Sequence, residues 1–175
     1  MAFEVAKALN SLLENGFSQV MFRYTDQEPG KYQHPSFYIC DLPAKRKKND
    51  PATNERESNA PYFVTRISRI TDEEESSVVY LETHCGIYTA ENEAAGDNDL
   101  SNMIMRGRRL ILENQMLDNR FELVFPMSSM FGDAEAQHAQ PHPFHEGVIK
   151  TAWKIPAVER ITSIEDEEKI YGSNI

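Results

Sequence analysis

"SVVYLETHCGIYT" (77–89) decides the fold, because its apolar residues alternate at the two-residue spacing of a β-strand. Successive side chains of a strand point to opposite faces. One face takes Val79, Leu81, Cys85 and Ile87, and the other takes Val78, Tyr80 and Tyr88. Apolar residues on both faces predict a strand that is covered on both sides for part of its length.

The neighbouring segments extend this strand into a sheet. "YFVTRISRI" (62–70) and the acidic link "TDEEES" (71–76) form a β-hairpin with it. In "GVIKTAWKIP" (147–156), apolar residues again alternate, and we expect Trp153 to be buried on the face that it shares with Ile149 and Ile155. The predicted strands are 17–25, 36–41, 62–70, 77–88, 121–125 and 148–155.

Two segments have the spacing of amphipathic helices, 3–14 and 100–115. We expect the first to end at Asn15-Gly16 and the second to begin after Asp99 as its N-cap. The apolar stripe of the second helix consists of Leu100, Met103, Ile104, Gly107, Leu110 and Ile111. The expected fold is therefore a single α+β domain, 1–156, with a mixed or antiparallel β-sheet and both helices packed on it.

Three polar segments lie outside this pattern. Residues 44–61 and 128–147 are long for loops within a compact domain, and such loops usually carry a function or are disordered. Residues 157–175 contain the acidic run "EDEE" and show no long periodic pattern. We interpret them as an acidic C-terminal tail or docking segment.

Composition restricts the possible partners. The 175 residues carry 28 acidic and 18 basic side chains, a net charge of −10, which argues against tight binding to a phosphate backbone. No segment has the length of a membrane span, and the N-terminus lacks a signal-peptide pattern, so we expect a soluble protein made in a cytoplasm. The isolated Cys40 and Cys85 are expected to be core residues.

A histidine-rich stretch, "HAQPHPFH" (138–145), raises the question of a metal site. His138, His142 and His145 are the candidate ligands, but Pro141 and Pro143 prevent the helix that would bring two of them together. We therefore expect a proline-stiffened loop that leads into a strand, with no metal and no cofactor. Since no nucleophile, phosphate-loop or dinucleotide motif is present either, we expect no catalytic residues and no enzyme.

Charge and a second apolar stripe indicate a possible interface between subunits. Met105 and Leu112 lie about 120° away from the core stripe of the second helix, beside Arg108 and Arg109. A second basic group lies at the start of the first long loop and consists of Lys45, Arg46, Lys47 and Lys48. Acidic residues are concentrated elsewhere, and segregated charges suit a head-to-tail contact between copies. Alternatively, these residues are independent features of a solvated surface.

The order of the elements resembles that of the tail terminator and neck proteins of long-tailed bacteriophages. Two stretches carry the resemblance, "GIYTAENEAAGDNDLSNMIMRGRRLI" (86–111) and "HPFHEGVIKTAWKIP" (142–156), and it covers about residues 3–156. The long loop 44–61 and the acidic tail depart from the pattern.

The resemblance implies a structural virion protein. It would form a homo-oligomeric ring, commonly a hexamer, in the neck of the tail after assembly in the host cytoplasm. Its partners would be the tail tube protein and the head–tail connector, and DNA would pass through the ring without specific binding. The negative charge fits that passage. Alternatives are a head–tail adaptor or stopper, a tube subunit, or a metal-binding domain built on the histidine loop.

Overall fold

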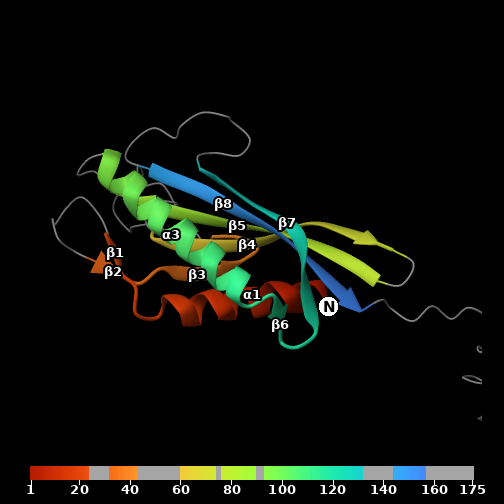
Figure 1. Ribbon diagram of the computed structural model, residues 1–175. Coiled ribbons are helices and arrows are strands. Elements are labelled where there is room, and N and C mark those ends of the chain that lie inside the picture. The colour runs from red at the N-terminus through yellow and green to blue at the C-terminus, as the bar shows by residue number, and fades with distance from the viewer. Residues whose placement is uncertain (24–31, 43–59, 74–75, 90–92, 132–143, 157–175) are drawn as a thin grey trace, which may run out of the picture.

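The computed structural model describes residues 1–23, 32–42, 60–73, 76–89, 93–131 and 144–156 (Figure 1). Within these residues the elements are α1 (Ala2–Phe17), β1 (Phe22–Arg23), β2 (Tyr32–Gln33), β3 (Ser36–Ile39), β4 (Tyr62–Asp72), β5 (Ser76–Tyr88), α3 (Glu93–Glu113), β6 (Met116–Leu117), β7 (Phe121–Phe131) and β8 (Phe144–Pro156).

The main sheet has the strand order β3-β4-β5-β8-β7-β6. The pair β3–β4 is parallel and the other pairs are antiparallel, so the sheet is mixed. The predicted hairpin is present as β4–β5, and β5 also pairs along its whole length with β8. The chain thus has the expected α+β fold, with the N-terminal helix packed on a mixed sheet.

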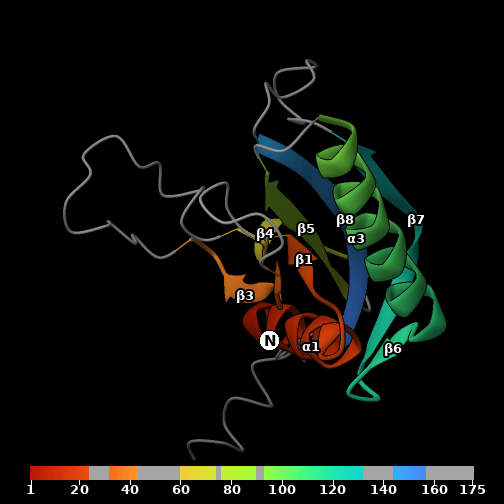
Figure 2. The same ribbon diagram turned by 90° about the vertical axis from the view of Figure 1, so that its left-hand side faces the viewer.

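Both helices cover the same face of the sheet (Figure 2). Trp153 is fully buried between them and the sheet, as predicted, and its Nε1 donates to Thr151 Oγ1 at 2.9 Å. The largest fully buried side chains are Trp153, Phe17, Phe63, Phe121, Leu9, Leu13, Leu81, Ile87, Met103, Ile104, Ile111 and Ile149. The predicted stripe of the second helix therefore forms the centre of the core.

Glycines allow α3 to lie close to β8. A Cβ at Gly147 would be 2.5 Å from Ile104 Cδ1 and 2.8 Å from the Met130 carbonyl oxygen. A Cβ at Gly107 would meet Ile149 Cδ1 at 3.0 Å. The helix can approach the strand this closely because neither glycine places a side chain in the contact.

The opposite face of the sheet is apolar at one end. Tyr62, Val64 and Tyr88 are buried there in a second cluster, and Tyr38 and Phe144 pack against it. Because Val64 and Tyr88 lie on strands whose other face packs on the helices, the central strands are covered on both sides at this end, as the sequence predicted.

The N-terminal boundaries differ from the prediction. The helix α1 continues through Asn15-Gly16 to Phe17, and Gly16 packs closely against Leu110. The predicted strand 17–25 is wrong at its start: within the described residues 17–23, only Phe22–Arg23 form a strand, and it pairs with β2 outside the main sheet. Residue 17 is a core residue of the helix instead, where its ring contacts Phe63 at 4.9 Å between centroids.

The second helix begins earlier than expected. It starts at Glu93, so Asp99 lies inside it and is not its N-cap. The acidic residues that precede the predicted start of this helix occupy its first turns, where negative charge stabilises a helix. Gly96, which interrupts the helical pattern in the sequence, lies against the His145 ring.

The predicted loop 128–147 is also partly wrong, because β7 runs to Phe131 and β8 begins at Phe144. Pro126 does not end β7. It lies at a register shift between Val124 and Ser128. The regular hydrogen bonds between β7 and β8 are already interrupted there, so a residue without an N–H can be accommodated. Cys85 is buried, as expected, whereas Cys40 is exposed and has a φ of 72°. Residues 44–59, 132–143 and 157–175 lie outside the described residues.

Candidate functional site

The predicted interface on α3 is divided by the structure. Met105 is 57% exposed, whereas Leu112 is partly buried and packs against the main core. The two residues therefore do not form one exposed stripe. Met105 alone is available on the outer side of the helix.

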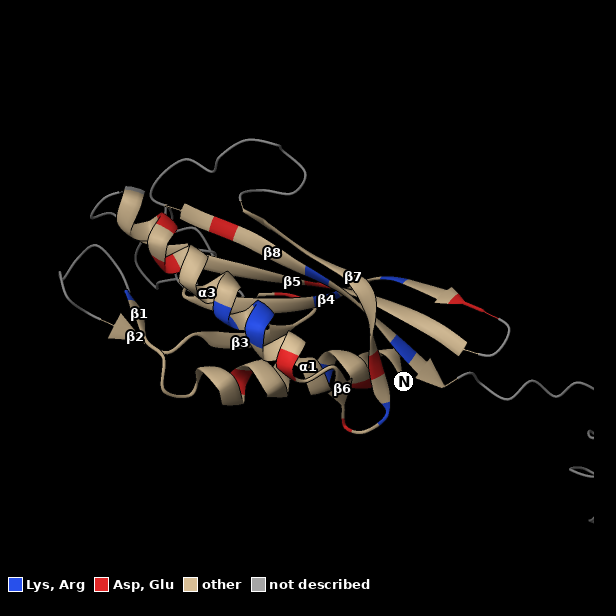
Figure 3. Ribbon diagram, in the orientation of Figure 1, with Lys and Arg blue, Asp and Glu red and all other residues tan. Residues whose placement is uncertain are grey.

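The arginines beside Met105 each have a contact. Arg106 donates to the Gly16 carbonyl oxygen at the end of α1, at 3.0 and 3.2 Å from its two nitrogens. Arg108 Nη1 lies 3.4 Å from Ser129 Oγ on β7, and Arg109 Nε donates to Glu113 Oε1 at 2.7 Å. Figure 3 shows the resulting basic segment in the middle of α3, between acidic ends. Lys45, Arg46, Lys47 and Lys48 lie outside the described residues.

On the side of the sheet that the helices cover, β7 also carries an exposed apolar side chain. Phe131 is 57% exposed and pairs with Gly147, the residue against which Ile104 packs. Phe131 and Met105 therefore lie at the same position along β8, next to the contact between Ile104 and Gly147. We call Met105 and Phe131 the α3–β7 patch; each of the two side chains is 57% exposed.

The strand beside the patch has an open edge. The short strand β6 pairs only with Phe121 and Glu122, and Leu123 N–H donates to the Gln115 carbonyl oxygen at 2.8 Å. From Val124 to Phe131, no strand in the described part of the chain pairs with the outer side of β7. Unpaired N–H and C=O groups beside exposed apolar side chains are suited to association with another chain.

Only part of the histidine stretch lies within the described residues. His138 and His142 lie outside the described residues, whereas His145 lies in β8 and is 4% exposed. His145 Nδ1 is 2.9 Å from Asp97 Oδ1, so the ring joins the first turns of α3 to the sheet. Within the described ranges, no three His, Cys, Asp or Glu side chains are grouped so that they could hold a metal ion.

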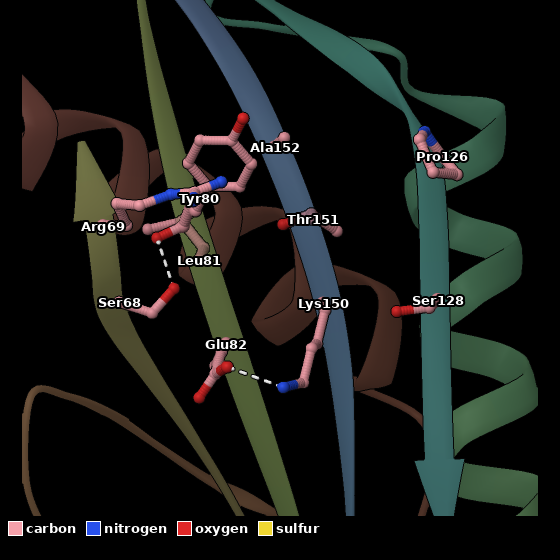
Figure 4. Close-up of a pocket in the computed structure, with 10 residues that line it drawn as sticks. All are labelled: Ser68, Arg69, Tyr80, Leu81, Glu82, Pro126, Ser128, Lys150, Thr151 and Ala152. Atoms are coloured by element: carbon pink, nitrogen blue, oxygen red, sulfur yellow. Dashed lines mark hydrogen bonds and ion pairs between the residues drawn. The ribbon is translucent and has the colours of Figure 1, made fainter. Parts of the chain in front are cut away.

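A shallow groove of about 260 Å³ lies on the face of the sheet opposite the helices (Figure 4). Its floor is formed by β5 and β8, and its sides by β4 and β7. The lining residues are Ser68, Arg69, Tyr80, Leu81, Glu82, Pro126, Ser128, Lys150, Thr151 and Ala152. The residues on its sides lie at or next to the register shifts of β4 and β7.

Two contacts organise the charges in this groove. The Arg69 guanidinium carbon lies 4.1 Å from the centre of the Tyr80 ring, a cation–π contact. Lys150 Nζ lies 2.8 Å from Glu82 Oε1, and this hydrogen bond holds the pKa of Glu82 below its usual value of 4.5. On the same face, His84 Nε2 is 3.6 Å from Glu82 Oε2, and burial lowers the pKa of His84 below 6.5.

The sequence did not identify this groove. The alternation of apolar residues in the sequence placed Tyr80 and Lys150 on the face opposite Leu81 and Trp153. It did not indicate which residues of neighbouring strands pair with one another. Arg69 comes to face Tyr80 because Ser68 is an extra residue at the β4 shift, and that shift has no clear signal in "TRISRI" (65–70).

Comparisons with known proteins do not assign the chain to a group. No protein-family description matched it, and no curated protein was similar to it. Within the residues that the structure describes, no helix has the length and apolar character needed to cross a membrane.

Proposed function

We propose that the chain is a structural virion protein whose copies form a ring that terminates the tail tube of a long-tailed bacteriophage. The ring joins the tail to the head connector. The proposal extends the resemblance carried by residues 86–111 and 142–156. The structural observation that supports it is the α3–β7 patch beside an open strand edge, because such a surface favours association of the protein with further chains.

The two edges of the sheet support a head-to-tail arrangement. At one edge, β7 is open from Val124 to Phe131 within the described chain. At the other edge, β3 covers only Tyr62–Thr65, so among described strands the outer part of β4 has no partner. A contact that joins two different surfaces of the same chain generates a ring if the rotation closes.

Charge is consistent with both the contact and the passage of DNA. Basic residues lie on α3 beside the patch, whereas Asp72 and Glu73 lie at the far end of β4. Opposite charges on the joined surfaces orient the copies as they meet. The net charge of −10 per chain would repel DNA inside the ring rather than bind it.

The test is an assembly experiment with the purified full chain. We expect negative-stain images to show closed rings, and rings to appear at one end of tubes when the tail tube protein is added. Long tubes made of this chain alone would indicate a tube subunit. Rings that bind only the connector would indicate an adaptor or stopper. A monomer at micromolar concentration, with or without tube protein, would contradict the proposal.

A further inference from the structure

The groove on the face opposite the helices is positively charged in a negatively charged protein. Arg69 and Lys150 line it together with one acidic residue, Glu82, whereas the chain has a net charge of −10. Glu82 already binds Lys150 at 2.8 Å. The charge that remains in excess is therefore that of Arg69.

Arg69 is oriented for a carboxylate. Its guanidinium carbon lies over the Tyr80 ring, 4.1 Å from the ring centre, and a guanidinium held over a ring face can still donate hydrogen bonds from its N–H groups. Among the described residues, no carboxylate forms an ion pair with Arg69. A planar guanidinium held in this way binds carboxylates with two parallel hydrogen bonds. The groove is open along the sheet, which suits an extended acidic peptide rather than a small molecule.

We propose that the groove is the docking site of the acidic C-terminal segment of the same chain, residues 157–175. Its run Glu-Asp-Glu-Glu at 165–168 supplies carboxylates for Arg69. The segment follows β8, which itself forms part of the floor through Lys150 and Ala152. This inference does not depend on the proposed ring.

The length of the chain allows this contact. At ~3.3 Å per residue, Ala152 lies about 13 Å along β8 from Pro156. The residues from 157 to 164 can span at most ~28 Å when extended. The segment is therefore long enough for the acidic run to reach its own groove, and tethering would give the run an effective concentration in the millimolar range, at which weak ion pairs suffice for docking.

Disulfide trapping in the full chain tests the proposal. Ser68 is exposed beside Arg69, so the variant combines Ser68→Cys with Glu167→Cys in a Cys40→Ser background. Cys85 does not interfere, because it is fully buried and burial raises the pKa of its thiol. We expect mild oxidation at low salt to close a disulfide within one chain, seen as a faster monomer band and by mass spectrometry.

Charge variants show whether the docking is specific. Arg69→Glu should slow closure by about fivefold or more, as should amide substitutions at 165–168. Arg120→Glu is the matched control, because Arg120 also lies over an aromatic ring, at 5.1 Å from the centre of Phe121, but outside the groove. A second control moves the groove cysteine to the end of α1, as Ser18→Cys, where we expect slow closure.

Three results would overturn the proposal. Closure at the same rate in Arg69→Glu and in Arg120→Glu would mean that Arg69 does not hold the segment. Equally fast closure from position 18 would mean that the segment contacts the surface at random. Disulfide-linked dimers in place of closed monomers would mean that the groove binds the tail of another copy.

Discussion

The two faces of the central strands have different chemistry. On the helix side, Leu81 and Trp153 belong to a continuous apolar core. On the opposite side, the residues next to them in the chain, Tyr80, Glu82 and Ala152, line an open groove together with Lys150. The same strands therefore serve packing on one face and carry fixed charges on the other.

This difference indicates on which face of the sheet a substitution should change the stability of the fold and on which face it should not. On the helix side, a changed side chain alters burial and close packing, which are worth several kcal/mol. On the groove side, most charges remain in contact with water, so their changes should affect docking more than stability.

Trp153→Ala should have the largest effect on stability. Its ring is fully buried, so its removal should lower the free energy of unfolding by about 3–5 kcal/mol. The control is Lys154→Ala, next in the chain but exposed on the other face, which should change it by less than about 0.5 kcal/mol. Urea unfolding measures both. A loss below about 1 kcal/mol for Trp153→Ala would contradict the assignment of faces.

Gly147→Ala should have the next largest effect. The added Cβ would lie 2.8 Å from a backbone oxygen, which cannot move without distorting β7, so we expect a loss of about 1–3 kcal/mol. Gly107→Ala meets only the end of the Ile149 side chain, at 3.0 Å, and gains about 1 kcal/mol of helix propensity. Thermal unfolding should therefore show a clear loss for the first variant and little change for the second. An unchanged stability of Gly147→Ala would mean that α3 and β7 do not lie this close to Gly147 of β8.

The smallest effect concerns pH on the groove side. Burial lowers the pKa of His84 in the folded state, so the unfolded chain binds a proton more readily there. The folded state has its full stability above the unfolded pKa of His84, about 6.5. It loses part of that stability as the pH falls through the lower folded pKa of His84. The free energy of unfolding of the wild type, relative to that of His84→Gln, should therefore fall on acidification below about 6.5. A difference that is constant from pH 8 to 5 would show that His84 is not held in its neutral form.

The sequence predicted the faces better than it predicted the edges. Alternation in 77–89 and 147–156 gave the correct buried residues, because one apolar core imposes the same period on both strands. Register shifts are set by contacts between strands, so the continuation of β7 beyond Pro126 and the position of Arg69 could not be derived from local pattern.

Gly96 and the acidic residues around it obscured the start of α3, since glycine weakens a helical signal even where close packing against His145 requires it. For the candidate interface, the helical period correctly separated Met105 from the core stripe but gave no means of showing that Leu112 packs inward.

We propose that copies of the chain join through the α3–β7 patch, and a single substitution tests this contact. Because Leu112 packs against the core, only Met105 is replaced, as Met105→Asp. The matched control is Met21→Asp, since Met21 is 54% exposed and Met105 is 57% exposed, but Met21 lies outside the patch.

The measurement is the mass of each protein in solution by light scattering at micromolar concentration, with circular dichroism to establish that the variants are folded. We predict a closed ring for wild type, a hexamer if the resemblance holds, and for Met21→Asp. For Met105→Asp we predict a folded monomer. A folded Met105→Asp that still forms the same ring, or a wild-type chain that remains monomeric, would contradict the account.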